Sequence, residues 1–228
     1  MINEEMQFKV SIIEDSPIHR EWLKIELSDH QKIKLLSADR FGRDGIESIK
    51  FHRPHIVLLD FQLEDMTGLE VAKRIKLFDP KIKIFILTAH TAISIIERII
   101  RNKNIDAIAI KGSYDFETNF ISIIIYVAKS GPYLDSSLLI QLREYGSLQG
   151  IAQLTGREFE IFIQSSAGKQ DERIAKDLCV ELSHIRNLKT RISKKIKDDN
   201  IGSIISNLIN NTNPIPLFNC YQGSLQYE

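Results

Sequence analysis

The sequence predicts a doubly wound α/β domain with a parallel sheet, followed by a small all-helical domain. Up to about residue 130, short aliphatic runs alternate with longer amphipathic segments, as in repeated βαβ units. The run HIVLLD at 55–60 is continuously apolar, as expected of a parallel strand that is buried on both faces. From residue 154 onward, helical patterns occur without any strand-like run.

The first domain is predicted to contain five strands and five helices. The strands comprise residues 8–13, 33–37, 56–60, 82–88 and 107–110. Between them, apolar residues at helical spacing predict helices over residues 19–27, 44–51, 69–77, 92–101 and 116–129. We therefore expect a five-stranded parallel sheet with helices on both faces.

The alternating pattern ends at Ser130, Gly131 and Pro132, because glycine next to proline is strong turn punctuation. We expect the first domain at residues 1–130, a linker at 131–152, the helical domain at 153–212 and a C-terminal tail at 213–228. Within the helical domain, the patterns predict helices over residues 158–165, 172–178, 182–196 and 201–208.

Composition excludes several classes of protein. The 228 residues are 43% hydrophobic and 26% charged, close to globular averages, so the chain is neither mainly disordered nor a coiled coil. Thirty basic residues balance thirty acidic ones, so any signal for nucleic acid must be local. The two cysteines form no CxxC, which argues against a cysteine zinc site or a disulfide scaffold. The six histidines are scattered and are predicted at the surface.

The location is predicted to be cytoplasmic. No apolar run approaches the roughly 20 residues that a membrane-spanning helix needs, so no membrane partner is expected. The N-terminal segment MINEEMQFK lacks the apolar core of a secretory signal.

Polar residues stand at the ends of several predicted strands. Glu14 and Asp15 end the first strand, Asp60 ends the third, Thr88 ends the fourth, and Lys111 follows the fifth. In an open parallel sheet, ligands bind at the carboxyl ends of the strands, so these side chains are expected to face one crevice. Three carboxylates that meet there repel one another unless a hard cation such as Mg²⁺ lies among them. The pattern predicts a magnesium site.

One carboxylate of such a site can act as a nucleophile toward phosphorus and form an aspartyl phosphate. Asp60 is the candidate because it ends the central strand. Lys111 can pair with a phosphoryl oxygen, and the Thr88 hydroxyl can donate a hydrogen bond to another.

The first domain resembles the receiver domain of two-component response regulators, which has a flavodoxin-like fold. The resemblance rests on IIEDS at 12–16, LLDFQLEDMTGLE at 58–70, LTA at 87–89 and IKG at 110–112. It implies that Asp60 is the phosphoacceptor for a histidine kinase, that Thr88 and Lys111 form the switch, and that Mg²⁺ has four ligand residues. These ligands are Glu14, Asp15, Asp60 and the backbone carbonyl of Gln62.

Two positions depart from the receiver pattern. Glu64 stands where receivers usually have proline. Ile108 stands where many have an aromatic residue that moves inward on phosphorylation, so the aromatic half of the switch is absent.

The segment 182–197 has the pattern of a recognition helix. Leu182, Ile185, Leu188, Ile192 and Ile196 form one apolar stripe at spacings of three or four. The opposite face is basic and polar, with side chains that suit base edges and phosphates. Six basic residues occur in this segment without any acid: Arg186, Lys189, Arg191, Lys194, Lys195 and Lys197.

Residues 154–197 resemble the LuxR-type helix-turn-helix of NarL/FixJ response regulators. The resemblance rests on LTGRE, AGK, IA and the closing RISKKI. It implies a DNA-binding domain and, for the active protein, a homodimer. The base-proximal residues would be Arg186, Asn187 and Thr190, and the phosphate-proximal residues would be His184, Lys189, Arg191 and Lys194. Cys179 replaces the usual turn glycine, and Glu181 replaces the usual cap of the recognition helix.

The leading hypothesis is a DNA-binding response regulator that is not an enzyme. Its phosphorylation on Asp60 would control transcription through the helix-turn-helix. Three other hypotheses stay open: a transcription factor that does not depend on phosphorylation, a magnesium-dependent phosphatase, and a helical domain that binds protein instead of DNA. Against the phosphatase, Gln62 occupies the position where a second acid would follow Asp60.

Overall fold

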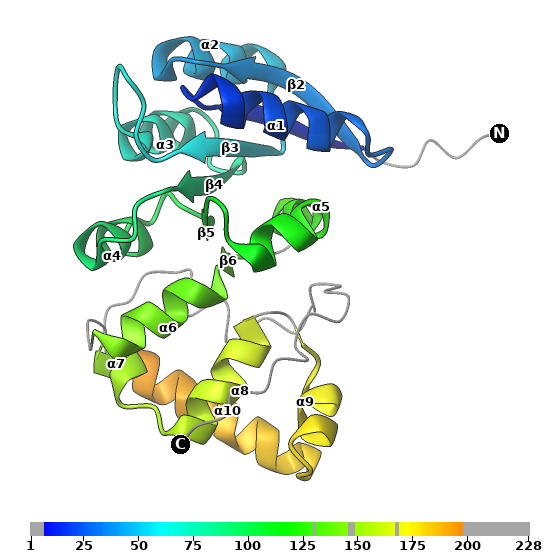
Figure 1. Cartoon of the computed structure of the whole chain (residues 1–228), viewed down its shortest axis with the longest axis vertical. Helices are drawn as coiled ribbons and strands as arrows, with labels where there is room; N and C mark the ends of the chain where they lie inside the picture. The colour runs from blue at the N-terminus through cyan, green and yellow to red at the C-terminus, as the bar shows by residue number, and fades with distance from the viewer. Residues whose placement is uncertain (1–6, 130, 146–148, 167–168, 198–228) are drawn as a thin grey trace, which may run out of the picture.

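The computed structural model describes residues 7–129, 131–145, 149–166 and 169–197 of the 228. The N-terminal part is a parallel sheet in the order β2-β1-β3-β4-β5-β6 (Figure 1). The chain moves outward from β1 to β2 and then returns to place β3 on the other side of β1, so the topological switch point lies between β1 and β3. The strands are β1 Phe8–Ile13, β2 Ile33–Asp39, β3 Ile56–Asp60, β4 Lys83–Thr88, β5 Ala107–Ile110 and β6 Tyr133–Leu134.

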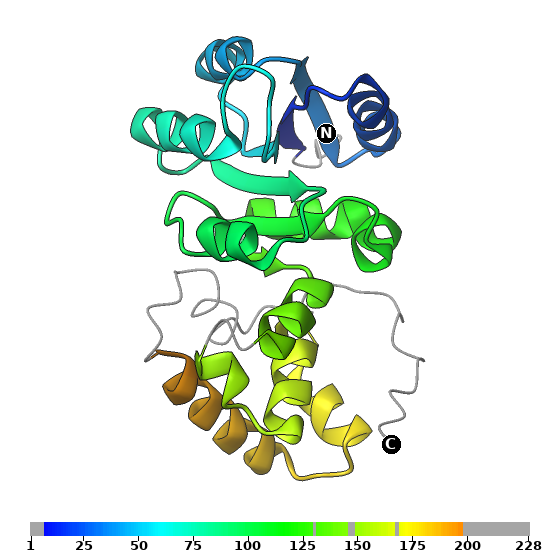
Figure 2. The ribbon, with the colours of Figure 1, turned by 60° about the vertical axis from the view of Figure 1, so that its left-hand side comes forward.

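Helices cover both faces of the sheet, and each face has its own core (Figures 1 and 2). Side chains from α1 and α5 pack with Ile56 and Leu58 on one face. Side chains from α2, α3 and α4 pack with Val57 and Leu59 on the other. All five residues of β3 are buried because consecutive side chains face opposite covered faces. The helices are α1 Pro17–Ser28, α2 Gly42–His52, α3 Gly68–Phe78, α4 Ile93–Ile100 and α5 Tyr114–Lys129.

The predicted fold class is confirmed, but the sheet has a sixth strand that the sequence analysis does not predict. Leu134 of β6 pairs with Ile108 of β5, and Tyr133 pairs with Ala107. A strand of two residues has no alternation to read, so its pairing depends on the tertiary fold. The segment between the two predicted domains therefore begins as an edge strand of the sheet.

The C-terminal part of the described chain is helical. It consists of α6 Ser136–Glu144, α7 Gln149–Ala152, α8 Gly156–Ser166, α9 Asp171–Asp177 and α10 Leu182–Lys197. Helix α6 packs against α4 of the sheet domain and against α7 and α8 of the helical domain. One continuous apolar cluster runs from the α4 face of the sheet through α6 to α8 and α10. The predicted helix over residues 201–208 lies outside the described residues, as does the tail at 213–228.

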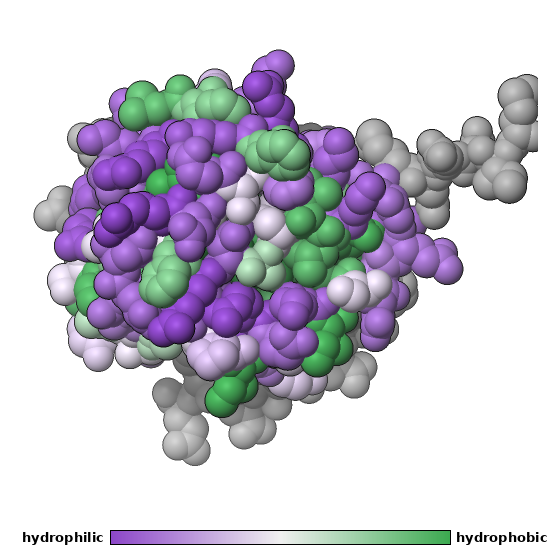
Figure 3. Space-filling model, turned by 90° about the horizontal axis from the view of Figure 1, so that it is seen from above, coloured by the Kyte–Doolittle hydropathy of each residue, from purple (hydrophilic) through white to green (hydrophobic). Residues whose placement is uncertain are grey.

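The surface over α1, α2 and β2 is mostly hydrophilic, with separate hydrophobic patches (Figure 3). The large apolar side chains that are exposed on these helices include Ile18 and Ile25 of α1 and Phe51 of α2. None of the helices in the described part of the chain has the length and apolar character that crossing a bilayer requires.

Candidate functional site

Three carboxylates meet at the switch point of the sheet. Glu14 and Asp15 follow β1, and Asp60 ends the neighbouring strand β3. One carboxylate oxygen from each residue lies within 4.8 Å of the others. Glu14 and Asp60 are buried, and Asp15 is half-buried. The predicted acids therefore form one cluster, at the edge where a doubly wound sheet binds its ligand.

A single lysine bridges two of these carboxylates. The Nζ atom of Lys111 lies 2.8 Å from Oε2 of Glu14 and 3.0 Å from Oδ1 of Asp60. Lys111 follows β5, and its backbone N–H donates to the carbonyl of Thr88 at 2.9 Å. Thr88 is fully buried at the end of β4, and its hydroxyl oxygen accepts the backbone N–H of His90 at 3.0 Å. The structure thus brings Asp60, Thr88 and Lys111 to one edge, as predicted from their strand ends.

The pKa values of Glu14 and Asp60 are shifted in opposite directions. For Asp60, burial and the neighbouring Glu14 raise the pKa above its ordinary value, although Lys111 opposes them. For Glu14, burial also acts to raise the pKa, but hydrogen bonds from His19 and Lys111 outweigh it and the pKa is lowered. The cluster therefore has more negative charge than one lysine can balance.

The loop after Asp60 needs glycine at position 68. A Cβ atom on Gly68 would lie 2.4 Å from the backbone oxygen of Asp60, which is too close for any side chain. The Gly68 N–H donates to the Phe61 carbonyl, and Thr67 caps α3. Gln62 is exposed on this loop, and its side-chain oxygen lies 2.8 Å from Nε2 of His90. Glu64, at the usual proline position, forms an ion pair with Arg40.

The donor set suits a magnesium ion. Its acids supply only oxygen atoms, and the excess of negative charge on Asp60 and Glu14 is what a hard divalent cation offsets. Candidate ligands are the carboxylates of Glu14, Asp15 and Asp60. The Gln62 carbonyl, implied by resemblance, lies on the adjoining loop.

Sequence analysis missed three residues around this cluster. The prediction that the histidines are surface residues is wrong for His19, whose Nδ1 lies 2.7 Å from the buried carboxylate of Glu14. His19 also stacks on Trp22. Arg20 donates to the backbone carbonyls of Glu14 and Asp15, and His90 reaches Gln62. No spacing signal marks these residues, because the turn between β1 and α1 places His19 and Arg20, and the loop after β4 places His90.

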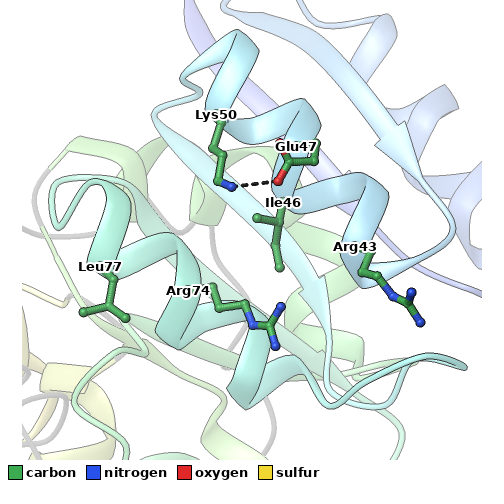
Figure 4. Close-up of a pocket in the computed structure, with 6 residues that line it drawn as sticks. All are labelled: Arg43, Ile46, Glu47, Lys50, Arg74 and Leu77. Carbon is green, nitrogen blue, oxygen red and sulfur yellow. Dashed lines mark hydrogen bonds and ion pairs between the residues drawn. The ribbon is translucent and has the colours of Figure 1, made fainter.

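A cavity lies between α2 and α3, with a volume of about 440 Å³ (Figure 4). Ile46 and Leu77 give it an apolar part, and Arg43, Lys50 and Arg74 line it with Glu47. All three cations already have partners, since Arg43 pairs with Asp65, Lys50 with Glu47 and Arg74 with Glu70. The cavity is separate from the carboxylate cluster, and we assign it no ligand.

The helical domain begins with a capping box. Thr155 and Glu158 of the LTGRE segment bond reciprocally, with each backbone N–H donating to the other side chain, at 2.8 and 3.3 Å. Glu158 also pairs with Lys195 of α10 at 2.6 Å. This segment therefore fixes where α8 starts and how α8 packs on α10.

The turn between α9 and α10 has the geometry of a helix-turn-helix. Cys179 has a φ of +52°, the left-handed conformation that normally favours glycine. Residues 174, 185, 188, 192 and 196 fill the space between the helices and are buried. The departure from glycine at 179 thus leaves the turn intact, at the cost of a strained backbone at Cys179.

The polar face of α10 is exposed. Of the predicted DNA-contacting residues, all but one are exposed: His184, Arg186, Asn187, Thr190, Arg191 and Lys194. Lys189 differs because it is half-buried and pairs with Asp171 of α9 at 2.8 Å. Arg186 lies 3.7 Å from Glu172, and both side chains are exposed. The face is therefore available, while Lys189 also holds α9 against α10.

Comparison with known proteins agrees with both parts of this geometry. The family model described as "Response regulator receiver domain" matches residues 10–111. The response regulator protein VraR of Staphylococcus saprophyticus is 24% identical over 192 residues, which cover 82% of this chain and 88% of that protein. The probable transcriptional regulatory protein NarL of Mycobacterium tuberculosis is 23% identical over the same share of this chain and 87% of its own.

Solved structures share the fold. A structure of two RcsB dimers bound to two parallel DNAs has a TM-score of 0.56 and 19% identity, and the match covers 90% of this chain and 97% of that one. The receiver domain of M. tuberculosis NarL has a TM-score of 0.51 and 22% identity, over 55% of this chain and 98% of that one.

The sheet and its carboxylate edge are those of a response regulator receiver domain. Over most of its length, the chain is similar to response regulators of the NarL type. The relatives that span most of this chain are named as regulators.

Proposed function

We propose that this protein is a cytoplasmic transcription factor controlled by phosphorylation of Asp60 by a partner histidine kinase. The observation that carries the proposal is the placement of Lys111, which contacts Asp60 and Glu14 beside the buried Thr88. A structural ion pair would need only one carboxylate, whereas this cluster has an excess of them. That excess favours a site that receives a cation and a phosphoryl group.

In the proposed reaction, a carboxylate oxygen of Asp60 forms a bond to phosphorus. The bond from phosphorus to the imidazole nitrogen of the kinase breaks, and its electron pair stays with that nitrogen. Bound Mg²⁺ supplies positive charge for the phosphoryl oxygens. Lys111 already contacts Asp60, so its ammonium group can pair with the new phosphoryl oxygen without crossing the site. The Thr88 hydroxyl is the second donor.

An exposed apolar side chain next to the site supports a protein as the phosphodonor. Ile18 is 83% exposed in the first turn of α1, three residues after Asp15. Ile25 lies two turns further along α1 and is also exposed. The two side chains are seven residues apart and so lie on one side of α1, where we propose that the kinase binds.

We further propose that the exposed face of α10 binds DNA. Arg186, Asn187 and Thr190 would address bases, and His184, Arg191 and Lys194 would contact phosphates. Lys189 would contact a phosphate while it also keeps its ion pair with Asp171. A homodimer would present two such helices to successive turns of the duplex. The domain limits at residues 130 and 153 remain our proposal for where regulation and DNA binding separate.

One observation favours the alternative in which DNA binding does not depend on phosphorylation. Ile108, at the aromatic switch position, is fully buried and pairs with Leu134 of β6. Without an aromatic side chain to move inward, the response to phosphate depends on Thr88, Lys111 and the backbone of β5.

A mass measurement tests the proposal and its alternative. Incubation with acetyl phosphate and Mg²⁺ is expected to add one phosphoryl group to the wild-type protein and none to Asp60→Asn. Glu64→Gln, on the same loop but exposed, is the matched control and keeps the modification. Uptake by Asp60→Asn, or no uptake by the wild type, would refute phosphorylation at this residue.

DNA footprinting with and without acetyl phosphate tests the proposal that α10 binds DNA. Binding is expected to strengthen with phosphorylation and to weaken as salt rises, because contacts to phosphates release counterions. Arg186→Ala with Lys194→Ala is expected to abolish the footprint, while Lys34→Ala on β2 leaves it unchanged. A footprint that survives the double substitution contradicts the assignment of α10. Equal footprints with and without acetyl phosphate favour the alternative.

A further inference from the structure

Asp135 is a fully buried carboxylate at the junction of the two domains. It stands between β6 and α6, and it is the N-cap of α6. Its Oδ1 accepts hydrogen bonds from the backbone N–H and the hydroxyl of Ser137, at 3.0 and 2.6 Å. Its Oδ2 accepts the backbone N–H of Ile110 at 3.4 Å. One side chain thus contacts both the start of α6 and the end of β5.

The backbone of Asp135 extends the short edge strand β6 by one position. The Asp135 N–H donates to the carbonyl of Ile108 at 3.1 Å, in line with the pairing of β6 and β5. The chain then turns into α6, and the side chain of Asp135 supplies the acceptor that Ile110 would otherwise lack. Ile110 is half-buried, and this contact gives its backbone N–H a protein acceptor at the end of β5.

The end of β5 carries the lysine of the phosphorylation site. Ile110 directly precedes Lys111, whose Nζ contacts Asp60. When a phosphoryl group attaches to Asp60, Lys111 exchanges its contact with Glu14 for one with a phosphoryl oxygen, which is a short displacement of its ammonium group. The backbone at Ile110 is the nearest element that can transmit this movement, and Asp135 is its partner on the C-terminal side.

Helix α6 links Asp135 to the DNA-binding helices. Leu138, Leu139 and Leu142 of α6 are fully buried in the cluster that includes α4, α8 and α10. Arg143 lies over the ring of Phe159 of α8 at 4.3 Å. A shift at the N-terminus of α6 therefore acts on a helix that is packed on both domains. A second contact, from the hydroxyl of Ser136 to the carboxylate of Asp115, holds the same helix end to α5.

We propose that Asp135 is a positioning residue that couples the state of Asp60 to α6 and, through α6, to the helical domain. The proposal rests on the phosphorylation of Asp60 proposed above. In it, Asp135 holds α6 to the end of β5, so that a change at Lys111 alters the stability of the first turn of α6. A helix cap alone would not need the contact to Ile110.

Asp135→Ser separates the two roles of the side chain. Serine is a good N-cap and can still accept the Ser137 N–H, but it is too short to reach Ile110. Asp135→Asn is the second variant. Its single oxygen cannot serve both sides, and its amide nitrogen would place a donor against the Ile110 N–H. Ser137→Ala is the matched control, since it removes a hydroxyl contact to Asp135 and leaves the contact to β5.

The experiment measures amide hydrogen exchange in α6 for the full chain, with and without acetyl phosphate and Mg²⁺. Mass spectrometry of the same samples reports phosphoryl uptake. In the wild type, phosphorylation is expected to change exchange in α6 by roughly fivefold or more, the lower end of measured coupling between sites. The Ser137→Ala control is expected to respond equally. Asp135→Ser is expected to take up the phosphoryl group normally while exchange in α6 no longer responds.

The outcomes separate this proposal from phosphorylation itself. If Asp135→Ser responds as the wild type does, or if wild-type α6 does not respond although Asp60 is phosphorylated, the coupling role is overturned and the proposed function stands. If the wild type takes up no phosphoryl group, both are overturned. If thermal unfolding shows that Asp135→Ser is not folded, Asp135→Asn decides: a reduced response supports the coupling role, and a full response overturns it.

Discussion

Two nearly buried carboxylates, one in each domain, hold a lysine, and they differ in what surrounds them. Asp60 of the receiver domain is 8% exposed and lies 3.0 Å from Lys111. Glu158 of the helical domain is 5% exposed and lies 2.6 Å from Lys195. By distance and burial, the two pairs are alike.

The pKa values of the two carboxylates are shifted in opposite directions. Burial and the nearby Glu14 raise the pKa of Asp60 despite its lysine. Burial also acts on Glu158, but its pKa is lowered because Lys195 and the Thr155 backbone donate hydrogen bonds to it. In the receiver domain two buried carboxylates share one lysine, whereas in the helical domain one carboxylate has a lysine and a backbone donor. The number of hydrogen-bond donors for each buried carboxylate therefore distinguishes a site that can bind a cation or phosphoryl group from a structural contact.

The largest effect is expected from Glu158→Ala. The change leaves Lys195 without its partner and removes the capping box, and it should cost about 3 kcal/mol of unfolding free energy. Glu158→Gln keeps an acceptor for the Thr155 N–H and should cost about 1 kcal/mol. Urea unfolding of both variants measures the difference. Equal losses would mean that the capping contact contributes nothing.

Lys111→Met should have the next largest effect, and Mg²⁺ should reduce it. Without the ammonium group, Glu14 and Asp60 repel each other with only His19 opposing, which should cost about 2 kcal/mol. Because Mg²⁺ offsets the same charge, its addition should restore part of the stability. Unfolding curves with and without Mg²⁺ measure this. A loss that Mg²⁺ leaves unchanged would show that the acids do not bind the ion together.

Asp60→Asn is expected to stabilise the protein in the absence of Mg²⁺. Its raised pKa means that the ionised carboxylate is disfavoured in the folded state, so removing the charge should add up to about 1 kcal/mol near neutral pH. The melting temperature of the wild type should rise with Mg²⁺, and that of the variant should rise less. Loss of stability in Asp60→Asn would show that the pair with Lys111 outweighs the repulsion from Glu14.

The smallest effect is a difference in pH dependence. The lowered pKa of Glu158 gives stability that is present above its ordinary pKa and is lost as pH falls through the folded-state value. The raised pKa of Asp60 acts in the other direction, because its penalty is relieved as pH falls through the folded-state value. Melting temperatures from about pH 7 to about pH 3 should fall less steeply for Glu158→Gln and more steeply for Asp60→Asn than for the wild type. Parallel curves for the two variants would contradict the opposite shifts.

Much of the fold follows from local pattern in the sequence. Short aliphatic runs predicted every strand of the receiver domain except β6. A strand that is buried on both faces, such as Ile56–Asp60, leaves a continuous apolar run in the sequence. Helix ends were less predictable. Helix α5 begins at Tyr114, two residues before the predicted start, because a helix end depends on capping contacts more than on periodicity.

The candidate site was predictable only in part. Asp60, Thr88 and Lys111 stand at strand ends, and parallel strands bring their carboxyl ends to one edge of the sheet. His19 could not be found in this way, because its contact to Glu14 depends on how the chain turns from β1 into α1. The pairing of Lys189 with Asp171 was also hidden, because it depends on the angle between α9 and α10.

By itself, the sequence determined the class of fold, the edge of the sheet that carries the acids, and the basic face of α10. Each is a repeating or ordered local property, since hydrophobic period and strand order are written along the chain. Only the tertiary structure decided that β6 joins the sheet and that Asp135 lies between β5 and α6. These contacts join residues about 25 positions apart in sequence. Such pairings form where packing brings the backbones together, and a strand of two residues is too short to carry a periodic signal.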